Sequence, residues 1–191
     1  MGYLLFEAVL RIIVRWVVVG LVCLYALGAL AESPGMDSAR TNVIQAGMVN
    51  GFTTYTTWPN PDTTDPFVIG VMGAQNLFIP ALQRFFAKKP VFPHRQIDIR
   101  EVTLKEVTDC HLLVIFGQAN EQGDAILAKV ASLPILTISD QAHFAESGGH
   151  VNFYHENNKL RFAINWKTTH HSNLKISSRL LRLARVIGKP K

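Results

Sequence analysis

The feature that most constrains the fold is an unbroken apolar run, Leu112–Phe116, which ends at Gly117. Two further short apolar runs, Phe67–Met72 and Ile135–Ser139, each begin after a proline. Runs of this length without polar alternation are typical of strands that are covered on both faces of a sheet. The sequence therefore predicts a sheet whose interior strands are fully buried.

Segments with other periodicities lie around these strands. Gln96–Val102 alternates as a half-exposed strand does, and Val151–His155 and Leu160–Asn165 have the pattern of a hairpin joined by 156–158. Helical spacing of apolar residues appears in Asp37–Tyr55, Asn76–Ala87, Glu121–Ser132, Gln141–Glu146, Trp166–Asn173 and Ile176–Ile187. Parallel strands need crossover connections, which are usually helices that cover the sheet. We therefore expect an α/β fold, with a mostly parallel sheet flanked by helices, a C-terminal β-hairpin and a terminal helix.

The beginning of the sequence has the pattern of an export signal. Arg11 and Arg15 precede an apolar run, Trp16–Leu30, and Ala29-Leu30-Ala31 matches the small residues of a cleavage site. The run is shorter than the roughly 20 residues that a membrane span needs. We expect a cleaved signal peptide at residues 1–31, a single domain at 32–191 and a periplasmic location. The alternative is an uncleaved inner-membrane anchor.

The net charge and the distribution of basic residues indicate which kinds of partner suit the chain. Cleavage would remove Arg11, Arg15 and Glu7 and leave a mild net charge of +4. Basic residues cluster at Lys175, Arg179, Arg182, Arg185, Lys189 and Lys191. Such a cluster suits anionic lipid or a nucleic-acid backbone, but it is more often the solvated face of a helix. Export argues against nucleic acid.

Cys110 is the one cysteine that remains after cleavage, so no internal disulfide can form. It precedes a very apolar run, and we expect a buried, unreactive thiol.

Ser139, Asp140 and His143 are the residues that a hydrolase would use. A nucleophilic serine needs a base within hydrogen-bond reach, and Ser139 follows a strand, where the sites of parallel sheets often lie. The flanking glycines of a nucleophile elbow are missing. We favour a structural role, with Asp140 capping the helix expected at Gln141–Glu146.

Histidines and a glycine pair offer two other kinds of site. His143, His150, His155, His170 and His171 lack the spacing of a metal motif, so we interpret them as exposed loop residues rather than ligands. The pair at 148–149 is expected to form a tight turn, with an anion cradle as the alternative. We expect no metal and no cofactor.

An aromatic segment, Tyr55 to Pro59, includes Trp58. Packing of the first helix against the sheet is the simpler role for these residues. If they are partly exposed, they have the chemistry of interface anchors, because tyrosine and tryptophan dominate binding hot spots.

Seven pieces of the sequence resemble the YfiR-like family of periplasmic proteins in their order and spacing, over about 42–185. They are 55–59 (YTTWP), 67–73 (FVIGVMG), 110–113 (CHLL), 136–140 (LTISD), 148–153 (GGHVNF), 162–165 (FAIN) and 174–181 (LKISSRLL). The resemblance implies a non-enzymatic repressor that binds the periplasmic sensor domain of an inner-membrane diguanylate cyclase and thereby lowers cyclic di-GMP and restrains biofilm formation. It also implies that the protein can form a homodimer.

The contact residues that we predict for this partner are Tyr55, Trp58 and Pro59. Disulfide-based redox control, which some members of that family use, does not apply to a chain whose mature part carries Cys110 alone. Two other functions stay open at this point. One is a small-molecule binding or sensing module that uses Ser139, Gly148 and His150. The other is a serine-dependent hydrolase.

The cleavage site gives the first testable prediction. Protein recovered from the periplasmic fraction of the producing cells should begin at Glu32, because signal peptidase cuts after a small residue such as Ala31. Intact-mass measurement checks this. A full-length mass, found only in the membrane fraction, would establish the anchor instead.

Overall fold

A computed structural model describes residues 34–59, 65–73, 77–88, 91–92 and 94–189. The expected signal peptide, residues 1–31, lies outside this part of the chain. Residues from Ala39 onward form one compact unit. Within the described residues, no helix combines the length and apolarity needed to cross a bilayer.

Most strands of the described chain join one sheet. Its strands are β2 (Phe67–Met72), β3 (Ile97–Glu101), β4 (Leu112–Ile115), β5 (Leu136–Ser139), β6 (Val151–Glu156), β7 (Lys159–Asn165) and β9 (Arg185–Ile187). Their order is β3-β2-β4-β5-β6-β7-β9. All neighbours are parallel except the β6–β7 hairpin. The three apolar runs, β2, β4 and β5, lie inside the sheet, as the absence of alternation predicts.

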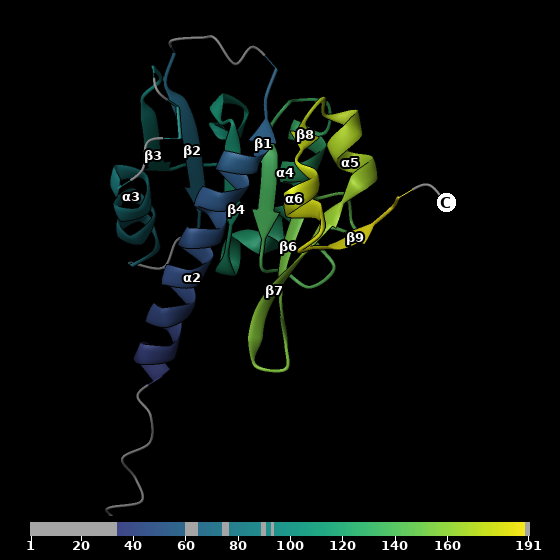
Figure 1. The fold of residues 1–191 in the computed structure, drawn as a ribbon. Coiled ribbons are helices and arrows are strands. Elements are labelled where there is room, and N and C mark those ends of the chain that lie inside the picture. Colours follow the sequence, from purple (N-terminus) through teal and green to yellow (C-terminus); the bar gives the residue numbers. More distant parts are fainter. Residues whose placement is uncertain (1–33, 60–64, 74–76, 89–90, 93, 190–191) are drawn as a thin grey trace, which may run out of the picture. The chain divides into compact units, whose positions relative to one another are not determined.

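Helices cover both faces of the sheet (Figure 1). On one face lie α2 (Pro34–Tyr55), α3 (Phe78–Lys88) and α6 (Ser178–Leu181), whose buried side chains share a core with one side of the strands. On the other face, α4 (Gly123–Val130) packs with the short 3₁₀ turns η1 (Val107–Asp109) and η2 (Gly117–Gln122). α5 (Trp166–His171) follows β7. The expected α/β class is confirmed.

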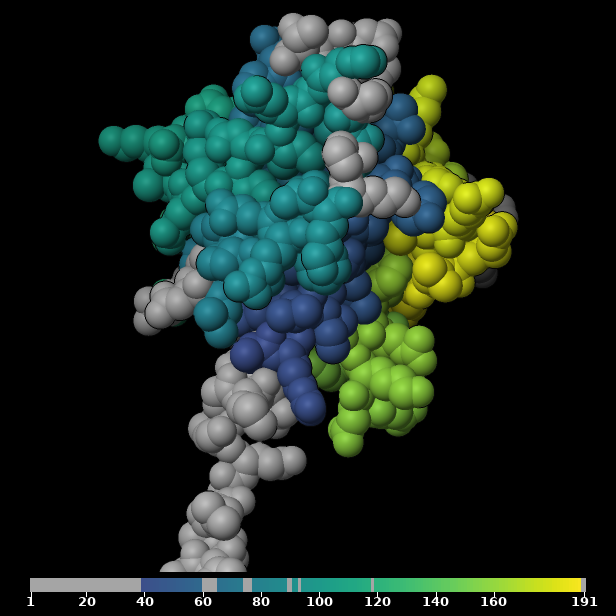
Figure 2. Space-filling view, turned by 60° about the vertical axis from the view of Figure 1, so that its left-hand side comes forward, coloured from purple at the N-terminus to yellow at the C-terminus, as the bar shows by residue number. Residues whose placement is uncertain are grey.

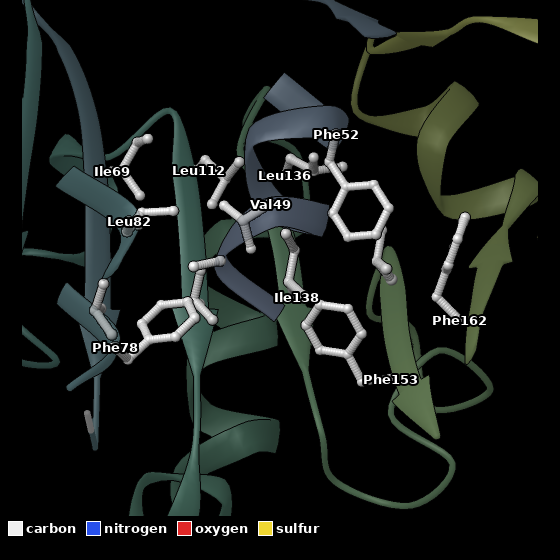
Figure 3. Close-up of a cluster of buried hydrophobic side chains, with 14 of the residues drawn as sticks. Val49, Phe52, Ile69, Phe78, Leu82, Leu112, Leu136, Ile138, Phe153 and Phe162 are labelled. Atoms are coloured by element: carbon white, nitrogen blue, oxygen red, sulfur yellow. The ribbon is translucent and has the colours of Figure 1, made fainter. Parts of the chain in front are cut away.

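Aromatic contacts hold α2 against the sheet. The ring of Phe52 lies 5.0 Å from that of Phe162, edge to face, and 5.9 Å from that of Phe153. Val49 of the same helix is fully buried beside Leu112 and its neighbours on the central strands (Figure 3). Because each buried aromatic removes a large apolar area from water, these contacts fix where α2 ends.

A second, two-stranded sheet continues from the end of α2. β1 (Thr56–Thr57) pairs antiparallel with β8 (Lys175–Ile176), and the amide of Ser177 donates to the carbonyl of Tyr55 at 2.9 Å. The strand at Lys175 and Ile176 was not predicted from the sequence, because a two-residue strand carries too little periodicity to recognise.

Two helix predictions were wrong, one in its existence and the other in its length. Residues 141–148 form successive turns, not a helix, and they end in the glycine pair as expected. The helix expected at Ile176–Ile187 is confined to Ser178–Leu181, and the chain then enters β9, which pairs parallel with β7. Val186 and Ile187 therefore belong to a sheet edge, so their apolar character was misread as part of a helical stripe.

The hairpin turn is as the sequence indicates. Asn157 and Asn158 have φ values of 51° and 57°. Two consecutive left-handed residues are the mark of a type I′ turn, which matches the twist of the strands, and asparagine tolerates this conformation better than most residues do.

Gly149 gives the second prediction. A Cβ at this position would overlap the ring of Phe144, which is 2 % exposed and cannot move aside. Gly149→Ala should lower the free energy of unfolding by about 2 kcal/mol, as overpacking of a closed core does. Chemical denaturation measures this.

Gly51→Ala is the matched control. A Cβ at Gly51 meets nothing within 4 Å, and the position lies inside α2. This variant should raise the free energy of unfolding by about 0.5–1 kcal/mol through helix propensity. An equal effect of the two substitutions would contradict the packing of Phe144 against Gly149.

Candidate functional site

A groove of about 820 Å³ lies where β1, β8 and α5 meet. Its walls combine two tryptophans with polar and apolar side chains. The lining residues are Thr57, Trp58, Pro59, Trp166, Thr169, His170, Asn173, Leu174, Lys175, Ile176 and Leu181. Trp58 and Pro59 of the aromatic segment, Tyr55 to Pro59, belong to this lining.

Trp58 forms the rigid wall of the groove. Its indole is 5 % exposed, meets Phe67 edge to face at 4.8 Å, and donates from Nε1 to the carbonyl oxygen of His111 at 3.0 Å. This burial agrees with the packing role considered from the sequence. Trp58 therefore shapes the groove, while its neighbours Tyr55 and Pro59 are exposed at the surface.

Trp166 and His170, one helical turn apart on α5, also line the groove. Their ring centroids lie 4.0 Å apart, and Nδ1 of His170 contacts the carbonyl oxygen of Trp166 at 2.9 Å. A carbonyl can only accept, so Nδ1 carries the proton and the ring is held in place. Lys175 from β8 adds a cation at the rim. Such a groove suits an extended segment or a side chain with an apolar body and polar edges.

A second hollow, of about 670 Å³, lies between α4, the turn that precedes β6 and the start of α5. Its charged lining residues include two acidic side chains, Asp124 and Glu146, and one basic side chain, Lys167. Gly148 and His150, two of the residues proposed from the sequence for small-molecule binding, also line this hollow, whereas Ser139 does not.

His150 is buried, and its interpretation as an exposed loop residue was wrong. Its side chain is only 3 % exposed. Nδ1 receives the Thr137 amide at 3.3 Å and the Thr137 hydroxyl at 2.9 Å, so Nδ1 is the acceptor and the proton is on Nε2. Nε2 then donates to the Ser172 hydroxyl at 2.7 Å, which in turn contacts the carbonyl oxygens of Thr168 and Thr169.

This network needs a neutral imidazole. Burial lowers the pKa of His150 to about 4. A proton on Nδ1 would remove the acceptor that both groups of Thr137 use. His150 therefore connects β5 and the start of β6 to the end of α5. It is a structural residue that also lines the hollow.

Ser139 has no features of a nucleophile. It is fully buried, its hydroxyl donates to Oδ1 of Asn120 at 2.8 Å, and it accepts the amide of Gln141 at 3.0 Å. The cap expected from Asp140 was wrong, because no helix follows it and Ser139 holds the amide instead. Asp140 accepts from Nδ2 of Asn120 at 3.1 Å. His143 is exposed with φ of 61°, and no hydrogen bond joins it to Ser139.

The remaining histidines do not converge. Nδ1 of His171 contacts the carbonyl of Lys167 at 2.8 Å, as Nδ1 of His170 does with that of Trp166. Among the described residues, no group of three or more histidine, cysteine or acidic side chains is arranged to hold a metal ion.

Cys110 is 5 % exposed, and burial raises its pKa to about 11. A thiol in this state forms little thiolate at neutral pH and reacts slowly. The expectation of a buried cysteine is confirmed, and its lack of reactivity stays a prediction.

Sequence reasoning missed a cluster formed by Arg95, His111 and Phe67, which contacts Trp58 through Phe67. Arg95 is 9 % exposed, donates to the carbonyl oxygen of Asp65, and lies over the ring of Phe67 at 5.1 Å and 2.6 Å from Nε2 of His111. Burial and the neighbouring Arg95 charge lower the pKa of His111 to about 4. The Phe67 ring stacks on His111, so this cluster supports the groove wall from below. In the sequence Arg95 follows Pro93 and precedes a strand, and nothing in this context indicated that its side chain is buried.

The chain belongs to the YfiR/HmsC-like family, whose model matches residues 42–185. This range includes α2 from Asn42, the whole of the groove and the second hollow. The resemblance expected from the sequence is thereby confirmed. None of the curated proteins compared matches the chain.

The buried histidine predicts how stability depends on pH. The pKa of His150 is about 4 in the folded protein and about 6.5 in the unfolded chain, so the unfolded chain binds more protons between these values. The stability that His150 contributes is complete above pH 6.5 and is lost as the pH falls toward 4. Between pH 7 and pH 5 the free energy of unfolding should fall by about 2 kcal/mol from this residue.

Denaturant unfolding at both pH values, for the natural protein and His150→Gln, measures this contribution. Glutamine keeps an acceptor and a donor but does not titrate, so the variant should lose less stability on acidification. His111→Gln is the companion variant, because His111 titrates in the same direction. An unchanged pH dependence in His150→Gln would show that His150 is accessible to protons in the folded state.

Proposed function

We propose that this protein is a periplasmic, non-enzymatic regulator that binds the sensor domain of an inner-membrane diguanylate cyclase and represses it. The observation that carries the proposal is membership of the YfiR/HmsC-like family over residues 42–185. Repression would lower cyclic di-GMP and restrain biofilm formation. Cleavage after Ala31 would release the regulator into the periplasm.

The groove supports a function through protein contact. It is open, and its Trp58 ring is held by the buried Phe67 while its Trp166 ring packs on His170, which limits the conformational entropy lost on binding. Tyr55, which is 41 % exposed, and Pro59 are the residues that would meet the partner first. Trp58 would contribute through the edge that lines the groove.

The state of Ser139 supports a non-enzymatic role. Its hydroxyl is fully buried and engaged with Asn120 and Gln141, so it neither faces a substrate nor has a base beside it. This geometry argues against Ser139 as the nucleophile of a hydrolase, the role that the order Ser139-Asp140-His143 suggested.

Regulation would work by a shift in populations. A protein that binds one conformation of a sensor domain more tightly than another favours that conformation by the difference in binding free energy. The regulator would hold the inactive conformation of the cyclase, and a signal that weakens binding would release it. Homodimer formation, which the resemblance implies, stays a prediction.

Small-molecule sensing is the second candidate function. The observation that favours it is the hollow beside Gly148 and His150, in which Lys167 faces the same space as Asp124 and Glu146. Charges of both signs around one cavity suit a zwitterionic ligand. Such a ligand would act on the same regulator, through the elements that His150 connects.

A retention experiment tests the partner contact. Tagged protein, immobilised and exposed to solubilised membranes, should retain a membrane protein with a diguanylate cyclase domain. Trp166→Ala should reduce retention about tenfold or more, because aromatic anchors in a groove carry much of the binding free energy. Pro59→Arg should have an effect of about the same size, because it places a long charged side chain at the groove. Leu77→Ala is the control, since Leu77 is an apolar side chain that is 55 % exposed and not part of the groove.

Deletion of the gene provides the cellular test. The concentration of cyclic di-GMP should rise, and Pro59→Arg should reproduce the deletion while the Leu77→Ala protein restores the natural concentration. An unchanged concentration after deletion would refute the regulator. A ligand-dependent rise in melting temperature together with no retained cyclase would favour the sensing function.

A further inference from the structure

The charge of the chain is divided sharply along the sequence. Asn157–Lys191 contains no acidic residue, and nine of the 19 basic residues of the chain lie there. The preceding residues carry all 14 acidic side chains and the other ten basic ones. The first part of the chain is therefore net negative, and the last 35 residues carry nine positive charges.

Lys159 and Arg161 belong to β7, and the other seven of these cations follow it in the chain. β8, α6 and β9 are successive elements beside α5, and their atoms, yellow in Figure 2, gather at one side of that view. Lys175, Arg179, Arg182 and Lys189 are all exposed. We call these four residues together with Leu183 the basic face.

Most of the charge on this face is not neutralised within the described chain. Arg185 pairs with Glu146 at 2.9 Å, and Arg161 lies 3.8 Å from Glu156. No ion pair of the described residues includes any of the four cations of the basic face. Their charge is therefore available to an external anion.

The helical turn at α6 separates an inner and an outer side. Leu180 is 5 % exposed, and Leu181 and Ala184 pack against the core. Hydrogen bonds from the amides of 182, 183 and 184 to carbonyls three or four residues earlier continue the turn beyond Leu181. Arg179, Arg182 and Leu183 are consequently spaced as i, i+3 and i+4, which places them together on the outer side.

Leu183 distinguishes this face from an ordinary solvated one. It is 72 % exposed, the largest value among the exposed large apolar side chains of the described residues. An exposed apolar side chain on the same side as two arginines is the pattern of surfaces that lie at a lipid interface, where cations meet phosphate groups and the apolar residue enters the acyl boundary. An acidic protein surface would pair with the cations but would offer Leu183 no apolar environment like the acyl boundary of a membrane.

We infer that the basic face docks on an anionic phospholipid surface. The chain would lie on the membrane reversibly, with Arg179 and Arg182 at the phosphates and Leu183 inserted between them. This attachment needs no protein partner, so it stands independently of the proposed cyclase and is tested without it.

Vesicle sedimentation tests the inference. Protein as released by the producing cells, with its N-terminus established by mass, is mixed with vesicles of phosphatidylcholine containing phosphatidylglycerol or with pure phosphatidylcholine. It should sediment with the anionic vesicles only, and added salt should release it, because screening weakens contacts with lipid charges. An N-terminal anchor would instead bind both vesicle types alike.

Variants localise the contact. R179E together with R182E should lower the partition coefficient roughly tenfold or more, and Leu183→Ser about threefold to fivefold. R84E together with K88E, which reverses two exposed cations of α3, is the matched control with the same net charge and should bind as the natural protein does. Melting temperatures establish that each variant is folded.

Three results would overturn the inference. One is equal binding to neutral and anionic vesicles. Another is an equal loss in both charge-reversed variants, which would show a dependence on net charge alone. The third is the absence of vesicle binding while R179E together with R182E abolishes retention of a solubilised membrane protein, which would assign the face to an acidic protein surface.

Discussion

The packing of α2 on the sheet is the contact on which the rest of this structure depends. Phe52 lies between the rings of Phe153 and Phe162, and Val49 is fully buried on the central strands. These contacts determine the point at which the chain leaves the helix and enters β1. β1 then pairs with β8, and Trp58 reaches the surface of Phe67, so the groove exists because α2 is fixed on the strands.

Polar networks complete what apolar packing begins. His150 joins Thr137 of β5 to Ser172 at the end of α5, and Arg95 and His111 support Phe67 beneath Trp58. Both histidines have lowered pKa values because burial disfavours their charged forms. A buried polar group is costly when it loses a partner, so these networks hold the elements around the groove in one arrangement.

The functions proposed for this chain belong to surfaces. Ser139 and Cys110, two residues with nucleophilic side chains, are both buried. The groove and the basic face are both built largely from the end of the chain, and Lys175 belongs to both. A regulator that meets a membrane-bound partner benefits from this proximity, because a protein held at the membrane surface searches a smaller volume for that partner.

The sequence by itself determined the α/β class, the three apolar strands β2, β4 and β5, the hairpin and the family. Each depends on local periodicity or on turn residues such as Asn157 and Asn158, whose backbone preferences act without tertiary contacts. Charge division along the chain is likewise a property of the sequence. Only the tertiary structure decided that Ile187 belongs to a strand, that His150 is buried and that Trp58 and Trp166 line one groove. These outcomes depend on residues distant in the sequence, since a strand edge, a burial site and a cavity wall are each completed by another segment of the chain.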